Sequence, residues 1–276
     1  MTEFRDNVVV ITGAGSGIGK ATALAFARQG ARLHLSDIDA EAVGAVADEA
    51  TTAGAATTTA YRTDVSDHDD VTALADAVFA AEGGVDVLHN NAGVGHGGEV
   101  QDTPISEWRR VLDVNLMGVV HGVEAFVPRM LTQGRPGHVV NTASLLGLIA
   151  GGRLAPYTTS KFAVVGLSES LDSELAPQGI RVTALCPGVI NTNIVATASF
   201  GGEMAERKQK AIDLYRKHGT SPDVVAEAVL SAVRRPRGIV VTPRWQVLPQ
   251  WLLKRASVRL SRPLSQRMAS LMSPGG

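Results

Sequence analysis

Three residues in the middle of the chain have types and spacing suited to proton transfer. Tyr157 and Lys161 are four residues apart, so on a helix they lie on one face. A free phenol has a pKa of about 10 and is a poor base, but a neighbouring ammonium favours the phenolate. Ser144 lies thirteen residues before Tyr157 and could stabilise charge on a reacting oxygen. This set could exchange a proton with an alcohol or carbonyl while a nicotinamide exchanges a hydride.

Each of these residues also has an ordinary structural interpretation. A Tyr and a Lys four apart on a helix commonly form a surface pair, and a serine after a strand commonly caps a turn. Their occurrence together, in order and after a glycine loop, is what favours chemistry.

That glycine loop, Thr12–Gly19, reads T-G-x-x-x-G-x-G after a short apolar run. Glycines at such a turn let the backbone approach a phosphate, and the following helix N-terminus supplies free N–H groups. The spacing fits neither G-x-G-x-x-G nor Walker A, because Ala14 and Ala21 fail the latter. Asp37, twenty residues after Gly17, could bind an adenosine ribose and repel a 2′-phosphate, which favours NAD over NADP. The plainer alternative is a tight turn, with Asp37 capping the next helix.

An alternating pattern of strands and helices must position these residues. Short β-branched runs predict strands at residues 8–12, 32–36, 56–62, 85–89, 138–143, 180–185 and 238–242. Periodic, often alanine-rich stretches predict helices at 17–29, 40–53, 69–81, 104–131, 157–175 and 221–233. The alternation predicts an α/β fold of three layers, a seven-stranded parallel sheet with helices on both faces.

The predicted domain organisation is one large domain with an appendage. Residues 1–244 form the expected nucleotide-binding and catalytic domain. Residues 193–220 interrupt the alternation as a charged, helical-looking insertion, which is typical of a substrate lid. Residues 245–276 form a basic, amphipathic C-terminal appendage.

Six motifs in order and in register resemble those of one family. Besides the glycine loop they are Asn90–Gly93, Asn115, Ser144, Tyr157 with Lys161, and Pro187-Gly188 with Thr192. The chain resembles the short-chain dehydrogenase/reductase family, in its simple single-domain branch, from about Asn7 to Thr242. The resemblance implies a Rossmann-type fold and an NAD(P)-dependent oxidoreductase that acts on CH–OH groups.

The resemblance also assigns residues to roles. It implies catalytic roles for Asn115, Ser144, Tyr157 and Lys161, with Asn115 anchoring a water that connects Lys161 to solvent. NAD is the expected cofactor, NADP the alternative, and no metal is expected. The expected cofactor contacts are Gly13, Ser16, Gly17, Ile18, Gly19, Asp37, Asp64, Val65, Asn91, Ala92, Gly93, Tyr157, Lys161, Pro187, Gly188, Ile190 and Thr192. Among these, the resemblance implies adenine contacts from Asp64-Val65 and contacts with the nicotinamide carboxamide from Ile190 and Thr192. It also implies a structural role for Asn90–Gly93.

Charge is distributed unevenly along the chain. The formal net charge is −1, but the first 227 residues carry −10 and the remainder, which has no acidic residue, carries +9. Within this basic part, Trp251–Arg262 is predicted to form an amphipathic helix, and Arg262-Pro263 is predicted to break the tail into two short helices. Such a helix could pack on the acidic body or another subunit, which we favour, or lie on an anionic membrane. Nucleic acid is disfavoured because no reading motif accompanies the charge.

Apolar residues near the expected cleft favour a hydrophobic secondary alcohol or ketone, such as a lipid, steroid or aromatic compound. They are Val94, Gly95, Leu145, Leu146, Leu148, Ile149, Ile194, Phe200, Met204 and Tyr215. The alternative is that these residues only seal the domain. A further alternative for the whole chain is a non-catalytic, cofactor-binding sensor or interaction protein on the same fold.

Composition adds expectations about partners and location. Hydrophobic residues make up 45% of the chain, so disorder is not expected. The single cysteine, Cys186, indicates a reducing compartment and is expected to be a buried filler. We expect a cytoplasmic homo-oligomer, a dimer or a homotetramer, with peripheral membrane contact through the tail as an alternative. Neither a signal peptide nor a spanning helix is expected. His96 could face the substrate, but as a loop histidine it is expected to be solvated.

Overall fold

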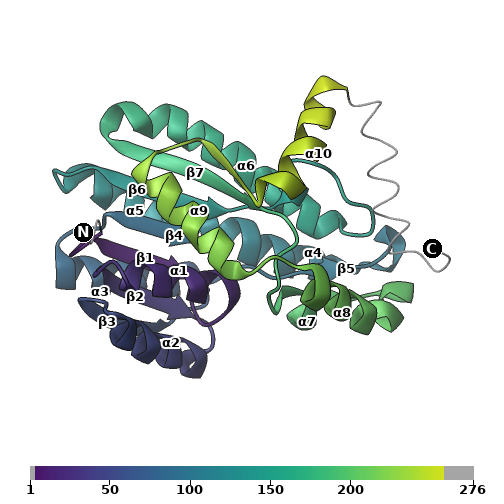
Figure 1. Cartoon of the computed structure of the whole chain (residues 1–276), viewed down its shortest axis with the longest axis horizontal. Helices are drawn as coiled ribbons and strands as arrows, with labels where there is room; N and C mark the ends of the chain where they lie inside the picture. Colours follow the sequence, from purple (N-terminus) through teal and green to yellow (C-terminus); the bar gives the residue numbers. More distant parts are fainter. Residues whose placement is uncertain (1–3, 258–276) are drawn as a thin grey trace.

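The computed structural model describes residues 4–257, and its centre is a parallel sheet in the order β3-β2-β1-β4-β6-β7-β9 (Figure 1). This arrangement confirms the predicted seven-stranded sheet. Two further short strands, β5 (His96–Gly97) and β8 (Ser199–Phe200), form a separate parallel pair. The strands of the main sheet are β1 (Val8–Thr12), β2 (Arg32–Asp37), β3 (Thr57–Arg62), β4 (Val87–Asn90), β6 (Gly137–Thr142), β7 (Ile180–Pro187) and β9 (Ile239–Thr242).

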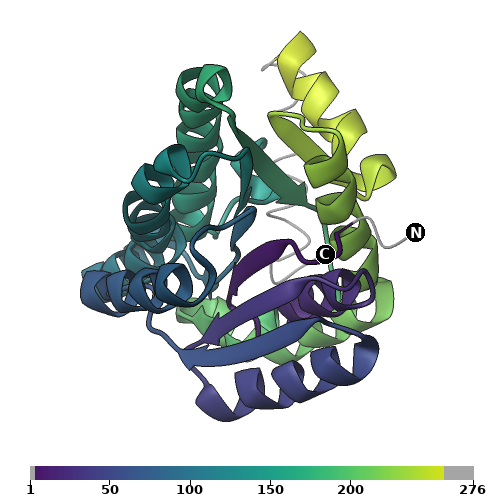
Figure 2. The same ribbon diagram turned by 90° about the vertical axis from the view of Figure 1, so that its left-hand side faces the viewer.

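Helices follow most strands and cover both faces of the sheet (Figure 2). The α-helices are α1 (Gly17–Ala27), α2 (Ala40–Ala53), α3 (His68–Glu82), α4 (Ile105–Leu112), α5 (Gly118–Thr132), α6 (Ala155–Leu175), α7 (Ile194–Thr197), α8 (Lys208–His218), α9 (Pro222–Arg234) and α10 (Arg244–Ala256). Short turns of other helix types are η1 (Val100–Asp102), η2 (Asp113–Met117), η3 (Leu145–Gly147), η4 (Ala176–Gln178) and η5 (Gly202–Arg207).

The core is divided by the sheet because successive strand side chains point to opposite faces. Val9 and Ile11 of β1 join the apolar cluster under α1, α2 and α9. Val8 and Val10 join the cluster under α3, α5 and the end of α6. All five residues of β1 are buried, as expected for a central strand of a parallel sheet.

The strand order reverses between β1 and β4, which pair in parallel through Val9–Ile11 and Val87–His89. The chain leaves β1 toward β2 on one side and leaves β4 toward β6 on the other. A crevice forms at such a switch point, outside the carboxyl ends of the strands. The glycine loop after β1 and the Asn90–Gly93 turn after β4 therefore meet there.

The single helix expected over residues 104–131 is interrupted. A π-helical turn, η2, separates α4 from α5 and contains the buried Asn115. The whole stretch Ile105–Thr132 is long and apolar enough to cross a membrane by length and composition. However, Phe126, Val127 and Met130 of α5 are buried in the core under the sheet, which accounts for its apolar character.

The first part of the basic tail is a helix, but its bounds and buried face differ from the prediction. α10 begins at Arg244 rather than at Trp251, and it ends at Ala256. Val247 is fully buried and Trp251 packs beside it, whereas Trp245 and Leu252 are exposed. Residues 258–262 of the expected helix, and the predicted break at Arg262-Pro263, lie outside the described residues.

Candidate active site

The glycine loop forms an open cradle between β1 and α1. Gly13 has a φ of +63°, and a Cβ there would lie 2.7 Å from the Cα of Ala92. A Cβ on Gly19 would collide with the Gly13 carbonyl, so both positions require glycine. Ser16 is the N-cap of α1 and makes no side-chain capping bond. The N–H groups at this helix end can therefore receive an anionic phosphate.

The turn after β4 braces the cradle. The Thr12 hydroxyl accepts hydrogen bonds from the backbone N–H groups of Asn91 and Ala92, at 3.0 and 3.2 Å. The Asn91 amide donates to the carbonyls of Thr12 and Gly13, at 3.0 and 3.1 Å. The two switch-point loops are thus tied together by hydrogen bonds between side chains and backbone, which supports the structural role implied for Asn90–Gly93.

Asp37, at the end of β2, faces the same cradle. One carboxylate oxygen accepts from the Gly15 N–H at 2.8 Å, and the other accepts from the Asp39 N–H at 3.1 Å. The interpretation of Asp37 as a helix cap is wrong, because Asp39 caps α2 by accepting from Ala42. Asp37 remains available on the cavity wall for a ribose.

Asp64 and Val65 follow β3 and line the same cavity. The Asp64 carboxylate accepts from the N–H and hydroxyl of Ser66, and the Asp64 N–H donates to Asp70. These bonds fix the loop backbone at the end expected to hold adenine.

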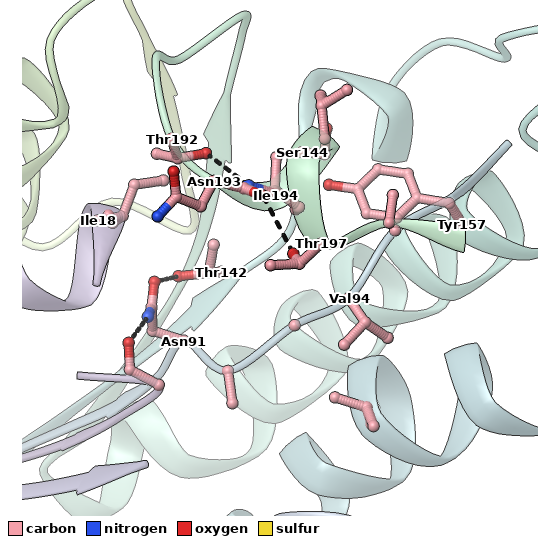
Figure 3. A pocket seen from close by; sticks show the side chains of 18 of the residues that line it. Ile18, Asn91, Val94, Thr142, Ser144, Tyr157, Thr192, Asn193, Ile194 and Thr197 are labelled. Carbon is pink, nitrogen blue, oxygen red and sulfur yellow. Dashed lines mark hydrogen bonds between the residues drawn. The ribbon is translucent and has the colours of Figure 1, made fainter. Parts of the chain in front are cut away.

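Tyr157 and Lys161 share one face of the first turns of α6, as predicted (Figure 3). The Lys161 ammonium lies 5.7 Å from the centre of the Tyr157 ring and donates to the Thr142 carbonyl at 2.8 Å. Ser144, just after β6, accepts from the Leu146 N–H at 3.1 Å. The Tyr157 hydroxyl points toward Ser144 in Figure 3, and the two groups are hydrogen-bonded.

The electrostatics of this group differ from the simple expectation. Burial raises the pKa of Tyr157, and the hydrogen bond with Ser144 lowers it only in part. Burial lowers the pKa of Lys161 to about 8. Desolvation therefore outweighs the predicted effect of the ammonium, and the phenol is protonated at neutral pH.

Asn115 does not line the cavity but lies buried behind it. Its side chain accepts from the Val94 N–H at 2.8 Å and donates to the Val94 carbonyl at 3.0 Å. Its amide also donates to the Ser160 hydroxyl at 3.1 Å, which itself donates to the Tyr157 carbonyl. Asn115 thereby connects the loop after β4 to the helix that carries Tyr157. It lies in the π-helical turn η2, and such turns are frequent at functional sites. Its role in holding a water stays a prediction.

The structure brings nearly all predicted site residues together around one cavity of about 740 Å³. The exceptions are Gly19, which packs inside the glycine turn, and Asn115. The predicted contacts that line the cavity are Gly13, Ser16, Gly17, Ile18, Asp37, Asp64, Val65, Asn91, Ala92, Gly93, Ser144, Tyr157, Lys161, Pro187, Gly188, Ile190 and Thr192. This placement fits the predicted roles.

The substrate side of the cavity is mostly apolar, with two corrections. Leu148 and Ile149 do not line it but pack into the core cluster beneath α6. His96 lines it and is only 2% exposed, so the expectation of a solvated histidine is wrong. The other residues expected in the cleft line it: Val94, Gly95, Leu145, Leu146, Ile194, Phe200, Met204 and Tyr215.

Sequence reasoning missed residues whose partners are distant in the chain. Leu154, Val195 and Ala198 also line the cavity. Gln246 of α10 accepts from the Val189 N–H at 2.9 Å, and nothing in the local pattern indicates this bond. Cys186 is buried as predicted, and burial raises the pKa of its thiol to about 12.

Comparison with known proteins bears directly on this site. The family model for short chain dehydrogenase matches residues 7–200, which include the glycine loop, Ser144, Tyr157 and Lys161. The chain belongs to this family. This is the family that the order and spacing of the sequence motifs predicted.

Two relatives of this short-chain dehydrogenase are informative. "Probable oxidoreductase EphD" of Mycobacterium tuberculosis is 42% identical over 271 residues, which cover 93% of this chain and 46% of that protein. The chain thus spans about half the length of the EphD proteins. Cyclohexanol dehydrogenase of Acinetobacter is 38% identical over 195 residues, covering 70% of this chain and 77% of that protein.

A solved neighbour identifies the group that fits the crevice. A short chain dehydrogenase/reductase from Burkholderia phymatum, in complex with NAD, has a TM-score of 0.87 and 36% identity. The match covers 94% of this chain and 96% of that chain. This neighbour supports the prediction that the crevice binds NAD.

Proposed function

We propose that this short-chain dehydrogenase interconverts a hydrophobic secondary alcohol and its ketone, with NAD as the preferred cofactor. The observation that carries the proposal is that Ser144, Tyr157 and Lys161 meet at the wall of a cavity whose other end is the glycine cradle. Relatives that act on cyclohexanol and on 1-deoxy-11-beta-hydroxypentalenate, both cyclic alcohols, support the substrate class. Activities of the longer relatives as whole proteins are outside this proposal.

The residues that would hold the cofactor are already arranged for it. The uncapped N-terminus of α1 would receive the pyrophosphate, and Asp37 would accept from the adenosine ribose. Bound NAD supplies the hydride acceptor. Lys161 would donate a hydrogen bond to the nicotinamide ribose, and its ammonium lies 5.7 Å from the centre of the Tyr157 ring.

The chain's own residues would manage the proton. During reduction, the protonated Tyr157 hydroxyl would donate its proton to the carbonyl oxygen. During oxidation, the deprotonated Tyr157 phenolate would accept the proton of the alcohol. Ser144 would hydrogen-bond the same oxygen and stabilise its developing charge. Burial favours the protonated phenol. Oxidation of the alcohol would therefore need a nearby positive charge, such as that of oxidised nicotinamide, to lower the pKa of Tyr157.

A panel of secondary alcohols and ketones, assayed with NAD and with NADP, tests this proposal. We expect turnover with apolar substrates, and we expect Tyr157→Phe to lower kcat by at least about a hundredfold, because the proton donor is lost. NADH binding to this variant, followed by fluorescence, should persist. Tyr61→Phe is the matched control, because Tyr61 hydrogen-bonds His34 on the sheet, away from the cavity.

Two outcomes would contradict the proposal. Turnover confined to small polar polyols, with long-chain ketones and steroids inert, would rule out the hydrophobic substrate class. NADH binding without turnover of any substrate would favour the alternative, a cofactor-binding sensor on the same fold.

We also propose a cytoplasmic homo-oligomer. The exposed Trp245 and Leu252 of α10, flanked by the exposed Arg244 and Arg255, support a further contact of this face. Another subunit is the partner we favour, and an anionic membrane surface is the alternative. The absence of a catalytic metal stays a prediction.

A further inference from the structure

The helix α10 reaches the cavity through one side chain in its first turn. The Oε1 atom of Gln246 accepts from the Val189 N–H at 2.9 Å. Its Nε2 atom faces the Thr220 hydroxyl at 3.4 Å. Val189 lies in the loop after β7, between Gly188 and Ile190, and this loop lines the cavity. Gln246 lies outside the residues matched by the family model.

Gly188 packs directly against the Gln246 side chain. A Cβ on Gly188 would collide with the Oε1 atom of Gln246, so glycine leaves room for the amide. The Gly188 N–H donates to the Thr242 carbonyl at 2.8 Å. Gly188 of the Pro187-Gly188 motif therefore contacts Gln246, a residue of the tail.

Thr220 closes the other side of this loop. The Thr220 N–H donates to the Val189 carbonyl at 3.0 Å, and the Asn191 N–H donates to the Thr220 carbonyl at 2.9 Å. Gln246 thus contacts both the cavity loop and the residue where the lid rejoins α9. It joins two segments whose relative position sets the shape of this end of the cavity.

Gln246 can hold the loop because α10 is itself fixed to the body. Val247 is fully buried in the cluster that contains Ala143 and Cys186. At the far end of the helix, the Lys254 ammonium donates to the Leu148 carbonyl at 2.7 Å and lies 4.3 Å from the centre of the Phe162 ring. These contacts anchor both ends of α10.

We propose that Gln246 is a positioning residue for the nicotinamide end of NAD. This inference rests on the NAD-dependent function proposed above. The Val189 N–H has Gln246 as its hydrogen-bond partner, so removal of the amide leaves a polar group unpaired and lets the loop move. Ile190 and Thr192, the expected contacts of the nicotinamide carboxamide, follow Val189 in this loop. Asp37 and Asp64, the expected contacts of the adenosine half, lie on loops that the described hydrogen bonds of Gln246 do not reach. The effect is therefore confined to the nicotinamide half of the cofactor.

The test compares NADH with ADP-ribose, which lacks the nicotinamide. Gln246→Leu keeps the approximate size of the side chain and removes both polar atoms. We expect its Kd for NADH, measured by titration calorimetry, to rise about tenfold, the equivalent of one lost hydrogen bond. The Kd for ADP-ribose should stay within about twofold of the wild-type value, because only the nicotinamide end is affected. Unchanged NADH affinity, or an equal loss for both ligands, would overturn the proposal.

Two further variants make the result specific. Gln250→Leu is the matched control and should leave both affinities unchanged. Among residues 4–257, the Gln250 side chain donates to the Gln246 carbonyl within the same helix and not to the cavity loop. Gln246→Glu retains an acceptor for the Val189 N–H and should retain wild-type discrimination between the two ligands. If Gln246→Glu behaves like Gln246→Leu, the hydrogen bond is not the cause. If the wild-type chain binds neither ligand, the proposed function itself fails.

Discussion

At the scale of single residues, burial decides the protonation states of the site. An ammonium four residues after a tyrosine predicts an acidified phenol, yet burial raises the pKa of Tyr157. Burial also lowers the pKa of Lys161 to about 8, so its charge is lost more easily than that of an exposed lysine. The two effects have one cause, since removing either group from water disfavours its charged form.

The Asp37 carboxylate is expected to make the chain prefer NAD to NADP. Asp37→Asn keeps an oxygen for the Gly15 N–H and removes the negative charge. We expect kcat/KM with NAD to fall about tenfold, because hydrogen bonds to a charged acceptor are the stronger ones. The ratio of kcat/KM with NADP to that with NAD should rise, because the repulsion of a 2′-phosphate is removed. Steady-state kinetics with both cofactors measures this change.

The control for that prediction is the neighbouring carboxylate that caps α2. Asp39→Asn removes the same charge while lying on the same cavity wall. If Asp39→Asn changed the cofactor preference equally, the cause would be the total negative charge around the cavity and not Asp37 itself.

At the scale of elements, the lid is fastened to the loop after β4. β8 of the lid pairs with β5, and the Ser199 hydroxyl donates to Glu107 of α4. Arg110 donates to Glu107, to Ser199 and to the Gly95 carbonyl. The buried His96 lies against the same groups, and burial is the main cause that lowers its pKa. The predicted lid, residues 193–220, is therefore tied to the loop after β4 and to α4 through a polar cluster.

Glu107 is the member of this cluster whose loss should free the lid. In Glu107→Ala, Ser199 and Arg110 lose their shared acceptor. We expect faster hydrogen exchange at the amides of Ser199 and Gly201, which donate to the carbonyls of Gly95 and Gly97. We also expect the KM for the alcohol to rise about tenfold, as for one or two lost bonds. The Kd for ADP-ribose should not change.

The exposed lid residue Glu206 provides the comparison. Glu206→Ala should alter neither the exchange rate nor KM. Normal exchange at β8 in Glu107→Ala would mean that the backbone pairing alone holds the lid.

At the scale of the whole molecule, the parallel sheet buries histidines in its strands. Burial lowers the pKa of His89 to about 3 and that of His138 to about 4. The unfolded chain binds these protons near pH 6.5, whereas the folded chain does not. The unfolded state thus binds more protons between those values, so the free energy of unfolding falls as pH decreases through this window.

His138 allows this effect to be measured. Its Nε2 atom lies 2.8 Å from the Thr183 hydroxyl on the neighbouring strand. We expect His138→Gln to reduce the loss of unfolding free energy between pH 7 and pH 5 by about 2 kcal/mol, as linkage requires for a pKa displaced this far. Urea unfolding at the two pH values measures it. His218→Gln, at an exposed position on α8, should leave the loss unchanged, and an equal effect there would refute the assignment.

The sequence by itself determined the fold class and the members of the site. The alternation of β-branched and periodic stretches predicted the seven parallel strands, because strand and helix periods are local properties of the chain. The glycine loop, Asp37 and the Tyr157–Lys161 pair were recognisable because their function depends on backbone freedom and short spacing. These features need no knowledge of distant contacts.

The tertiary structure alone decided how those members are tuned and held. The bond from Val189 to Gln246 joins residues 57 apart, and that between His96 and Ser199 joins residues 103 apart. The π turn that contains Asn115 and the burial of Tyr157 likewise depend on what packs around them. Desolvation and long-range hydrogen bonds arise only when remote segments meet, which is why no local pattern in the chain encodes them.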